Sequence, residues 1–307
     1  MNARPAAHGS FARARRGHAC ALFLAVSSLS APLLQCAQKV DPTPAELGPP
    51  DAGPEAAPPG DPGTLDPETP IPTNVECAET TKQIYVLATD KALYRFYPDK
   101  LSFVRVGQVA CPTGAGTFSM AIDRNGTAWV EFTDGRLFAV DTTTARCRTT
   151  PFQTKQKGFE TFGMGYALND DGSRNETLYV AGAGLASLNT TTFELKVLGS
   201  LTYGRTELTG LDNKLFAFSV GSGVIAGLNK TTGATEVTYR TTAVNERAAF
   251  AFAQWGGDFW VFTGDKHSSV TQYSPTEDKS RVVVENTGML IVGAGSSTCA
   301  PTSKVPR

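Results

Sequence analysis

The sequence predicts an all-β protein, a five-bladed β-propeller of four-stranded blades that follows a proline-rich segment. Three observations support this fold class. Beyond residue 74, short alternating apolar segments are separated by Gly, Asn, Asp and Thr turns, with little helical periodicity. One aromatic strand motif recurs five times. A strand near the C-terminus also matches a piece missing from the first copy.

The recurring strand supplies the period of the repeat. It reads "KQIYVLA", "GTAWVEF", "ETLYVAG", "NKLFAFS" and "GDFWVFT", with an aromatic at one position: Tyr85, Trp129, Tyr179, Phe216 and Trp260. The separations are 44, 50, 37 and 44 residues, the length typical of one propeller blade. We expect these aromatics to pack between blades, since a ligand platform does not require one in every repeat.

The remaining strands complete each blade. Each aromatic strand is followed by a second strand, such as "RLFAVDTT", and a third, such as "ELKVLGSL"; in repeats two to five a leading strand such as "GTFSMAID" precedes it. The first repeat lacks this leading strand, and "GMLIVGAG", residues 288–295, has no blade after it. The C-terminal strand is therefore predicted to complete the first blade and remove an open sheet edge. A weak sixth blade is the alternative.

The first 35 residues follow the plan of an export signal. A basic segment (12–18) precedes an apolar one (19–34) that is too short for a comfortable membrane span. At its end "LLQC" resembles the bacterial lipobox, which implies that Cys36 becomes the lipidated first residue of the mature chain. Ala37 then implies the outer membrane. The alternative is an ordinary signal peptide with Cys36 a free thiol.

A proline-rich linker, predicted to be disordered, extends from the anchor cysteine to the propeller, over residues 36–73. Residues 41–73 contain eleven prolines, seven acidic residues and no basic residue. Because proline fixes φ and removes an N–H donor, neither helix nor sheet persists there. The linker is either a stalk for the domain or a passive leader. The propeller is predicted over 74–301, followed by a disordered tail, 302–307.

The charge distribution argues against nucleic acid as a partner. The formal net charge is −1, and four arginines are the only charges in the first 35 residues. The remaining chain therefore holds 24 basic and 29 acidic residues, a net charge of −5. No basic footprint for a phosphate backbone is left.

The cysteines fit an exported domain. Once Cys20 leaves with the signal and Cys36 is lipidated, four remain, which allow three pairings. Ring closure brings Cys299, after the last strand, close to Cys77, before the first. Cys111 and Cys147 follow or lie within the outer strands of the neighbouring blades one and two, and could form the second bridge. The alternative, a four-thiolate zinc site, lacks CxxC spacing.

Two stretches carry a family resemblance. "FSMAIDRNGTAWVEFTDGRLFAVD" (118–141) and "FETFGMGYALNDDGSRNETLYVAGAG" (159–184) resemble a pattern of uncharacterised propeller lipoproteins of the myxobacterial type. More loosely, they are similar to repeats of NHL and sugar-lactonase propellers. The resemblance implies fold and export, and function must still be argued from a site.

The best candidate site is a polar ring at the propeller axis. Inner strands begin near the axis on the face where propellers usually bind ligands, and aligning the five predicted starts brings together hydroxyl, carboxylate and guanidinium groups. The predicted ring comprises Thr117, Glu160, Thr161, Arg205, Thr206, Glu207, Glu246, Arg247, Glu285 and Thr287. It is suited to a polyol, a peptide or a cation. The alternative is that these groups pair with one another and plug the channel.

Catalytic signatures are weak, so no catalytic residue, cofactor or resident metal is predicted. Glu160, Glu207, Glu246 and Glu285 could supply a hydrolase-like carboxylate pair, but none lies in a known hydrolase motif. The turns "NDDGSRNE" (169–176) and "DRNG" (123–126) are interpreted as tight turns, with bound calcium as the alternative. The prediction is an outer-membrane lipoprotein that binds a protein or glycan. A carbohydrate-active or lactonase-like enzyme is the alternative.

Overall fold

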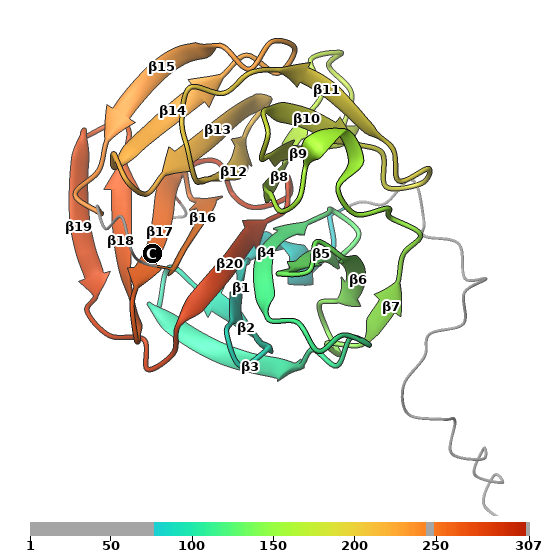
Figure 1. Ribbon diagram of the computed structural model, residues 1–307. Helices are drawn as coiled ribbons and strands as arrows, with labels where there is room; N and C mark the ends of the chain where they lie inside the picture. The colour runs from blue at the N-terminus through green and yellow to red at the C-terminus, as the bar shows by residue number, and fades with distance from the viewer. Residues whose placement is uncertain (1–76, 244–248, 305–307) are drawn as a thin grey trace, which may run out of the picture. The chain divides into compact units, whose positions relative to one another are not determined.

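The protein is built from five antiparallel sheets of four strands each, arranged around one axis (Figure 1). The structure is a computed structural model that describes residues 77–243 and 249–304. The predicted fold class and blade number are confirmed. The predicted signal segment, Cys36 and the proline-rich linker lie outside the described residues.

The first blade is closed by the C-terminal strand, as predicted. It contains β1 (Ile84–Ala88), β2 (Ala92–Tyr97) and β3 (Ser102–Gln108), with β20 (Ile291–Ser296) at the axis. The strand β20 runs antiparallel to β1, with Val86 opposite Ala294. A short 3-10 helix, η1 (Glu79–Lys82), precedes β1. The ring therefore closes by hydrogen bonds between the two ends of the described chain.

The other four blades follow in chain order from the axis outward. The second blade contains β4 (Thr117–Ile122), β5 (Thr127–Phe132), β6 (Leu137–Asp141) and β7 (Cys147–Thr149). After η2 (Gln156–Gly158), the third contains β8 (Gly163–Leu168), β9 (Glu176–Ala181), β10 (Leu185–Leu188) and β11 (Leu195–Gly199). The fourth contains β12 (Thr206–Leu211), β13 (Lys214–Ser219), β14 (Val224–Leu228) and β15 (Thr235–Arg240). The fifth contains β16 (Ala249–Trp255), β17 (Asp258–Gly264), β18 (Ser268–Ser274) and β19 (Lys279–Val284).

The core consists of five apolar clusters, one between each pair of neighbouring blades. Each cluster contains one of the five repeat aromatics, all of which are buried: Tyr85, Trp129, Tyr179, Phe216 and Trp260. The prediction that these side chains pack between blades is confirmed. Stacking the blades buries apolar faces that a lone hairpin would leave in water.

Glycines let the inner strands approach one another closely at the axis. A Cβ on Gly165 of β8 would lie 2.5 Å from the Leu208 carbonyl oxygen of β12. A Cβ on Gly210 of β12 would lie 2.2 Å from the Tyr166 carbonyl oxygen of β8. Because these neighbours are backbone atoms held in sheets, they cannot move aside cheaply. The tight packing of β8 on β12 therefore depends on the missing side chains.

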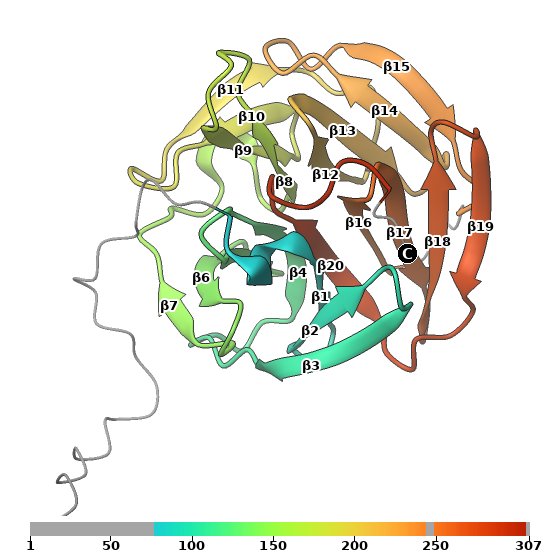
Figure 2. The ribbon, with the colours of Figure 1, turned by 180° about the vertical axis from the view of Figure 1, so that it is seen from behind.

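Two disulfides hold the first blade, with the predicted pairing. Cys77 bonds to Cys299 across 222 residues, and Cys111 bonds to Cys147 across 36. The first joins the segments before η1 and after β20, which lie together on the face seen in Figure 2. The second ties the segment after β3 to the start of β7 in the next blade. Within the described residues, neither short 3-10 helix has the length or apolar character to cross a membrane.

Candidate ligand-binding site

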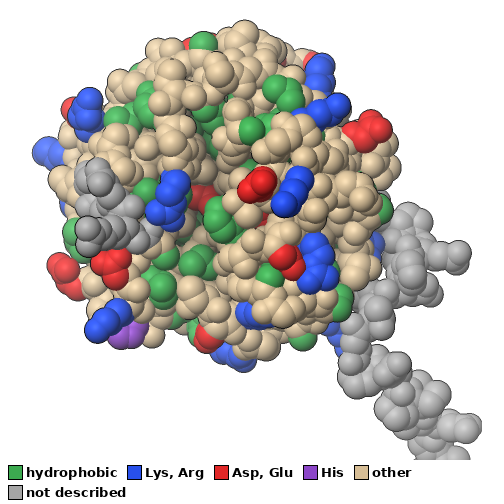
Figure 3. Space-filling view, in the orientation of Figure 1, with side chains coloured by type: hydrophobic (Ala, Val, Ile, Leu, Met, Phe, Trp, Pro, Cys, Tyr) green, Lys and Arg blue, Asp and Glu red, His purple; other side chains and the backbone are tan. Residues whose placement is uncertain are grey.

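A pocket of about 440 Å³ opens at the propeller axis, on the face where the inner strands begin. In Figure 3 this hollow lies at the centre of the ring, with acidic atoms deep inside and apolar side chains around it. All five inner strands or the residues just before them line it: Thr117 and Phe118, Phe162 and Gly163, Thr206 and Glu207, Ala249 and Phe250, and Val292. Its volume is in the range of small-ligand sites.

Half of the predicted polar ring lines this pocket. The five residues that do so come from the second, third and fourth blades: Thr117, Thr161, Arg205, Thr206 and Glu207. Glu160 is exposed, with its carboxylate 4.0 Å from Lys155 Nζ, and Glu285 is exposed after the outer strand β19. Neither of these two carboxylates is among the residues that line the pocket. Glu246 and Arg247 lie outside the described residues.

Thr287 is displaced from the ring because the last inner strand starts later than the aligned sequences suggest. Thr117 and Thr206 are the first residues of β4 and β12, whereas β20 begins at Ile291. The Thr287 hydroxyl donates a hydrogen bond to the Met289 carbonyl oxygen at 2.9 Å. The backbone N–H of Thr287 donates to the Ser268 carbonyl oxygen. In the connection from β19 to β20, Thr287 therefore stabilises a turn.

Glu207 forms the acidic part of the pocket lining. Its carboxyl reaches from β12 to two other blades, where Oε2 accepts hydrogen bonds from Ser119 Oγ at 2.8 Å and from the Met164 N–H at 3.3 Å. Burial raises the pKa of this carboxyl well above its usual range, although both hydrogen bonds act to lower it. Burial therefore makes this carboxyl harder to ionise than an exposed glutamate.

Glu131 is a second buried carboxyl next to this site, and it is not among the residues of the predicted ring. Its Oε2 accepts the N–H of Phe162, a pocket residue, at 2.9 Å. Its Oε1 has no hydrogen-bond partner among the described residues. Burial raises the pKa of Glu131 well above its usual range, and the charge of Glu207 acts in the same direction. A lone glutamate within the apolar strand "TAWVEF" is the signal that could have revealed it.

Glu131 and Glu207 accept hydrogen bonds from the N–H groups of Phe162 and Met164, which are two residues apart along the third blade. Of the two carboxyls, Glu207 is among the residues that line the pocket and Glu131 is not.

Two β-bulges shape the apolar wall of the pocket. In β4, Thr117 pairs with Phe132 and Ser119 with Glu131, so Phe118 is the extra residue. In β20, Ile291 pairs with Ala88 and Gly293 with Leu87, so Val292 is the extra residue. Both extra side chains are half-buried and line the pocket. A bulge re-aims one side chain, and both bulges here place an apolar one in the pocket lining.

Arg205 supplies the positive charge at the pocket. It lies just before β12, and its guanidinium carbon is 5.0 Å from the centre of the Phe250 ring, a cation–π contact. Its charge also acts to lower the pKa of Glu207. Among the described lining residues, Arg205 and Glu207 are the two ionisable ones.

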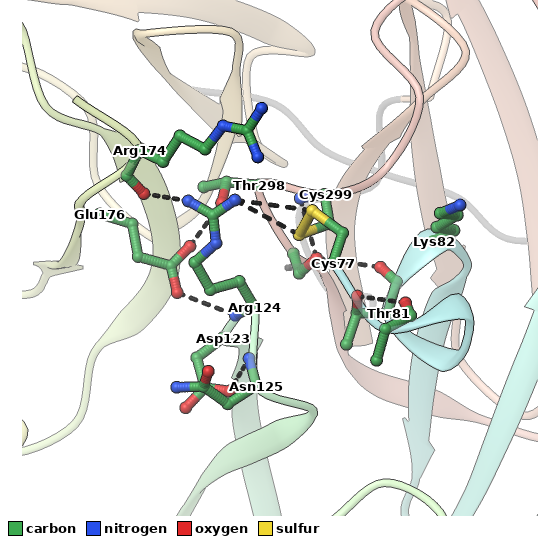
Figure 4. The surroundings of a disulfide bond; sticks show 12 residues. Cys77, Thr81, Lys82, Asp123, Arg124, Asn125, Arg174, Glu176, Thr298 and Cys299 are labelled. Atoms are coloured by element: carbon green, nitrogen blue, oxygen red, sulfur yellow. Dashed lines mark hydrogen bonds between the residues drawn. A yellow bond between two sulfur atoms is a disulfide. The ribbon is translucent and has the colours of Figure 1, made fainter. Parts of the chain in front are cut away.

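A separate polar cluster lies where the inner strand β4 ends (Figure 4). The guanidinium of Arg124 is 3.5 Å from Cys77 Sγ and 3.7 Å from Cys299 Sγ, and it also donates to the Arg174 carbonyl. Glu176 accepts the Arg124 N–H at 2.8 Å and the Thr298 hydroxyl at 2.6 Å. The cluster thus links the second and third blades to the closing disulfide.

The two turns with calcium-loop composition bind their own backbone. Asp123 accepts the N–H groups of Asn125 and Thr127 and the indole N–H of Trp129. Asp171 accepts the Ser173 N–H. Both segments contain turn residues, as expected from their composition. Within 77–243 and 249–304, no group of three potential ligands from His, Cys, Asp and Glu could hold a metal ion.

Comparisons with known proteins find remote structural similarity and no family. No family model and no curated protein matches the chain. A chain in the crystal structure of a nidogen/laminin complex is 13% identical, with 71% of this chain and 87% of that one covered and a TM-score of 0.46. A Bacteroides thetaiotaomicron protein of unknown function is 12% identical, with coverages of 67% and 56% and a TM-score of 0.45. One from Bacteroides caccae is 13% identical, with coverages of 66% and 73% and a TM-score of 0.37. With identities this low, no function is transferred from these structures.

Proposed function

We propose that this protein is an exported lipoprotein of the outer membrane whose propeller is a binding module for a protein or a glycan. Cys36 carries the lipid, and the proline-rich linker holds the propeller away from the membrane. The ligand, from the cell envelope or the extracellular space, enters the axial pocket. The observation that supports this proposal most directly is the pocket itself, which combines apolar walls with a few polar groups, as ligand sites generally do.

The anchor is tested by changing the cysteine that would carry the lipid. We expect the chain to incorporate a labelled fatty acid and to pellet with membranes, and Cys36→Ser to lose both properties because a serine accepts no diacylglyceryl thioether. The same measurement on Cys20→Ser is the control, since Cys20 would be removed with the signal. Equal labelling of the Cys36→Ser protein would contradict a lipid anchor at this position.

The role of the pocket is tested by filling its mouth. Thr133 is exposed and lines the pocket, so Thr133→Trp places an indole in the opening with little cost to the core. In the Cys36→Ser background, which removes the anchor, we expect Thr133→Trp to lower the affinity of the purified protein for isolated cell envelopes by about tenfold or more. The measurement is co-sedimentation at graded protein concentrations.

The matched control for this variant is Thr149→Trp, which places the same side chain on the exposed outer strand β7. It should bind envelopes as the parent does. If both tryptophan variants bind like the parent, the ligand does not enter the axial pocket.

A further inference from the structure

The two disulfides lie in different surroundings. Cys111 and Cys147 are only 8% and 7% exposed and belong to the apolar cluster between the first and second blades. Cys77 and Cys299 are half-buried. They lie on the face opposite the axial pocket, because the inner strand β20 begins at the pocket and ends just before Cys299. A thiol from solution therefore has readier access to the Cys77–Cys299 bond.

The guanidinium of Arg124 is held against this bond (Figure 4). Its Nη2 donates to Cys77 Sγ at 3.5 Å and to Cys299 Sγ at 3.7 Å. Its Nη1 donates to the backbone carbonyl of Arg174 in the third blade. The positive charge is therefore fixed beside both sulfur atoms by contacts at two of its nitrogens.

A positive charge in this position favours thiol–disulfide exchange. When a thiolate attacks one sulfur of a disulfide, the other sulfur leaves as a thiolate, and a more stable thiolate leaves faster. A neighbouring arginine stabilises a thiolate, whereas apolar surroundings destabilise it. Because Arg124 contacts both sulfur atoms, it can stabilise whichever cysteine leaves.

The carboxyl of the same cluster leaves much of this charge in place. Glu176 accepts hydrogen bonds from the Arg124 backbone N–H and from the Thr298 hydroxyl. Burial raises the pKa of Glu176 to about 7. Below that pH the carboxyl is mostly neutral, so it does not cancel the positive charge of Arg124 beside the sulfur atoms.

We propose that the Cys77–Cys299 bond is a thiol–disulfide exchange site, which a dithiol reductant opens on the folded propeller while Cys111–Cys147 stays closed. A thiolate of the reductant attacks one sulfur, the S–S bond breaks, and the other cysteine leaves as a thiolate beside Arg124. The second thiol of the reductant, as a thiolate, then attacks the mixed disulfide and releases the first cysteine. The reductant is oxidised to a disulfide, and the two protons that it loses convert both cysteines to thiols.

Opening the bond leaves the blades in place. The pairing of β1 with β20 still closes the ring by hydrogen bonds. What is released is the segment before η1, which follows the predicted linker, from the segment after β20. The reaction does not involve the axial pocket, so it is independent of the proposed binding function.

Reduction of the full chain under native conditions tests the proposal. Cys20→Ser and Cys36→Ser are introduced first, which leaves only the two bonded pairs. The protein is incubated with dithiothreitol at pH 7 and alkylated at intervals, and peptide mass spectrometry follows each bond. We expect Cys77–Cys299 to be reduced at least about tenfold faster than Cys111–Cys147, with no change in the far-ultraviolet circular dichroism spectrum.

Variants at Arg124 separate the effect of charge from that of packing. Arg124→Met should slow the reduction of Cys77–Cys299 by about tenfold, and Arg124→Lys, which keeps the charge, should slow it less. Looser packing alone would have the opposite sign, because it exposes the bond and speeds reduction. Arg174→Met is the matched control, since Arg174 is exposed and contacts Arg124 through a backbone carbonyl that methionine keeps. Its rate should stay close to that of the parent.

Three results would overturn the proposal. The first is reduction of both bonds at the same rate, or of Cys111–Cys147 before Cys77–Cys299. The second is reduction of Cys77–Cys299 only as the circular dichroism signal is lost, since the bond would then open by unfolding. The third is a rate that Arg124→Met leaves unchanged or raises.

Discussion

Replacing both cysteines of the Cys77–Cys299 disulfide with serine should lower the unfolding free energy more than the same replacement at Cys111–Cys147. The Cys77–Cys299 bond closes a loop across 222 residues, so its removal releases more chain entropy in the unfolded state than removal of Cys111–Cys147, across 36. In the chain-entropy model the two bonds contribute about 5 and about 4 kcal/mol. Serine also keeps an acceptor near the Arg124 guanidinium, which contacts both sulfur atoms.

Urea unfolding of the full chain measures this effect. We expect the Cys77→Ser/Cys299→Ser protein to lose about 2–5 kcal/mol of unfolding free energy, and its thermal midpoint to fall by roughly 2–4 °C for each kcal/mol. Amide exchange should increase first along β1 and β20, whose pairing closes the ring. The Cys111→Ser/Cys147→Ser protein is the control. If it loses as much stability and exchanges fastest in the same two strands, the first bond has no special role in closure.

The unfolding free energy should fall as the pH rises from about 5 to 8. Burial raises the pKa of Glu176 from 4.5 to about 7, against the hydrogen bonds from Thr298 and Arg124. A carboxyl whose pKa is raised in the folded state binds its proton more tightly there. Its favourable contribution is therefore complete below pH 4.5 and is lost as the pH rises through about 7. Asp123, Glu131 and Glu207 have pKa values shifted in the same direction by burial.

The unfolding free energy should fall by an amount on the order of 3 kcal/mol through Glu176 alone. Each pKa unit by which the folded and unfolded states differ corresponds to about 1.4 kcal/mol. Urea unfolding at several pH values in this range gives the slope. Glu176→Gln keeps an oxygen acceptor for the Arg124 N–H, presents an amide NH2 to the Thr298 hydroxyl, which can accept from it, and cannot ionise, so it should make the profile shallower. Glu277→Gln is the control, because ion pairs lower the pKa of this exposed carboxyl and it titrates below the range. A stability that is constant or rising with pH would contradict the prediction.

The sequence was sufficient to predict the blades because their signals are local. Alternating apolar residues, turn residues and an aromatic at each repeat are properties of short segments, and their recurrence indicates stacking. The closing strand and the Cys77–Cys299 pair followed from the same count, since a ring brings its first and last strands together. The prediction of the axial ring was less accurate for Thr287, because β20 begins only at Ile291, whereas β4 and β12 begin at the aligned residues Thr117 and Thr206.

By itself, the sequence determined the propeller, its closure and the face on which the inner strands begin. Only the tertiary structure decided which side chains meet at the axis. Phe118 and Val292 enter the pocket through bulges, and a bulge depends on the register between two strands rather than on the composition of either. Glu131 reaches Phe162 because neighbouring blades pack at a particular depth. Register and packing depth result from many contacts between distant segments, and for that reason neither can be inferred from one stretch of residues.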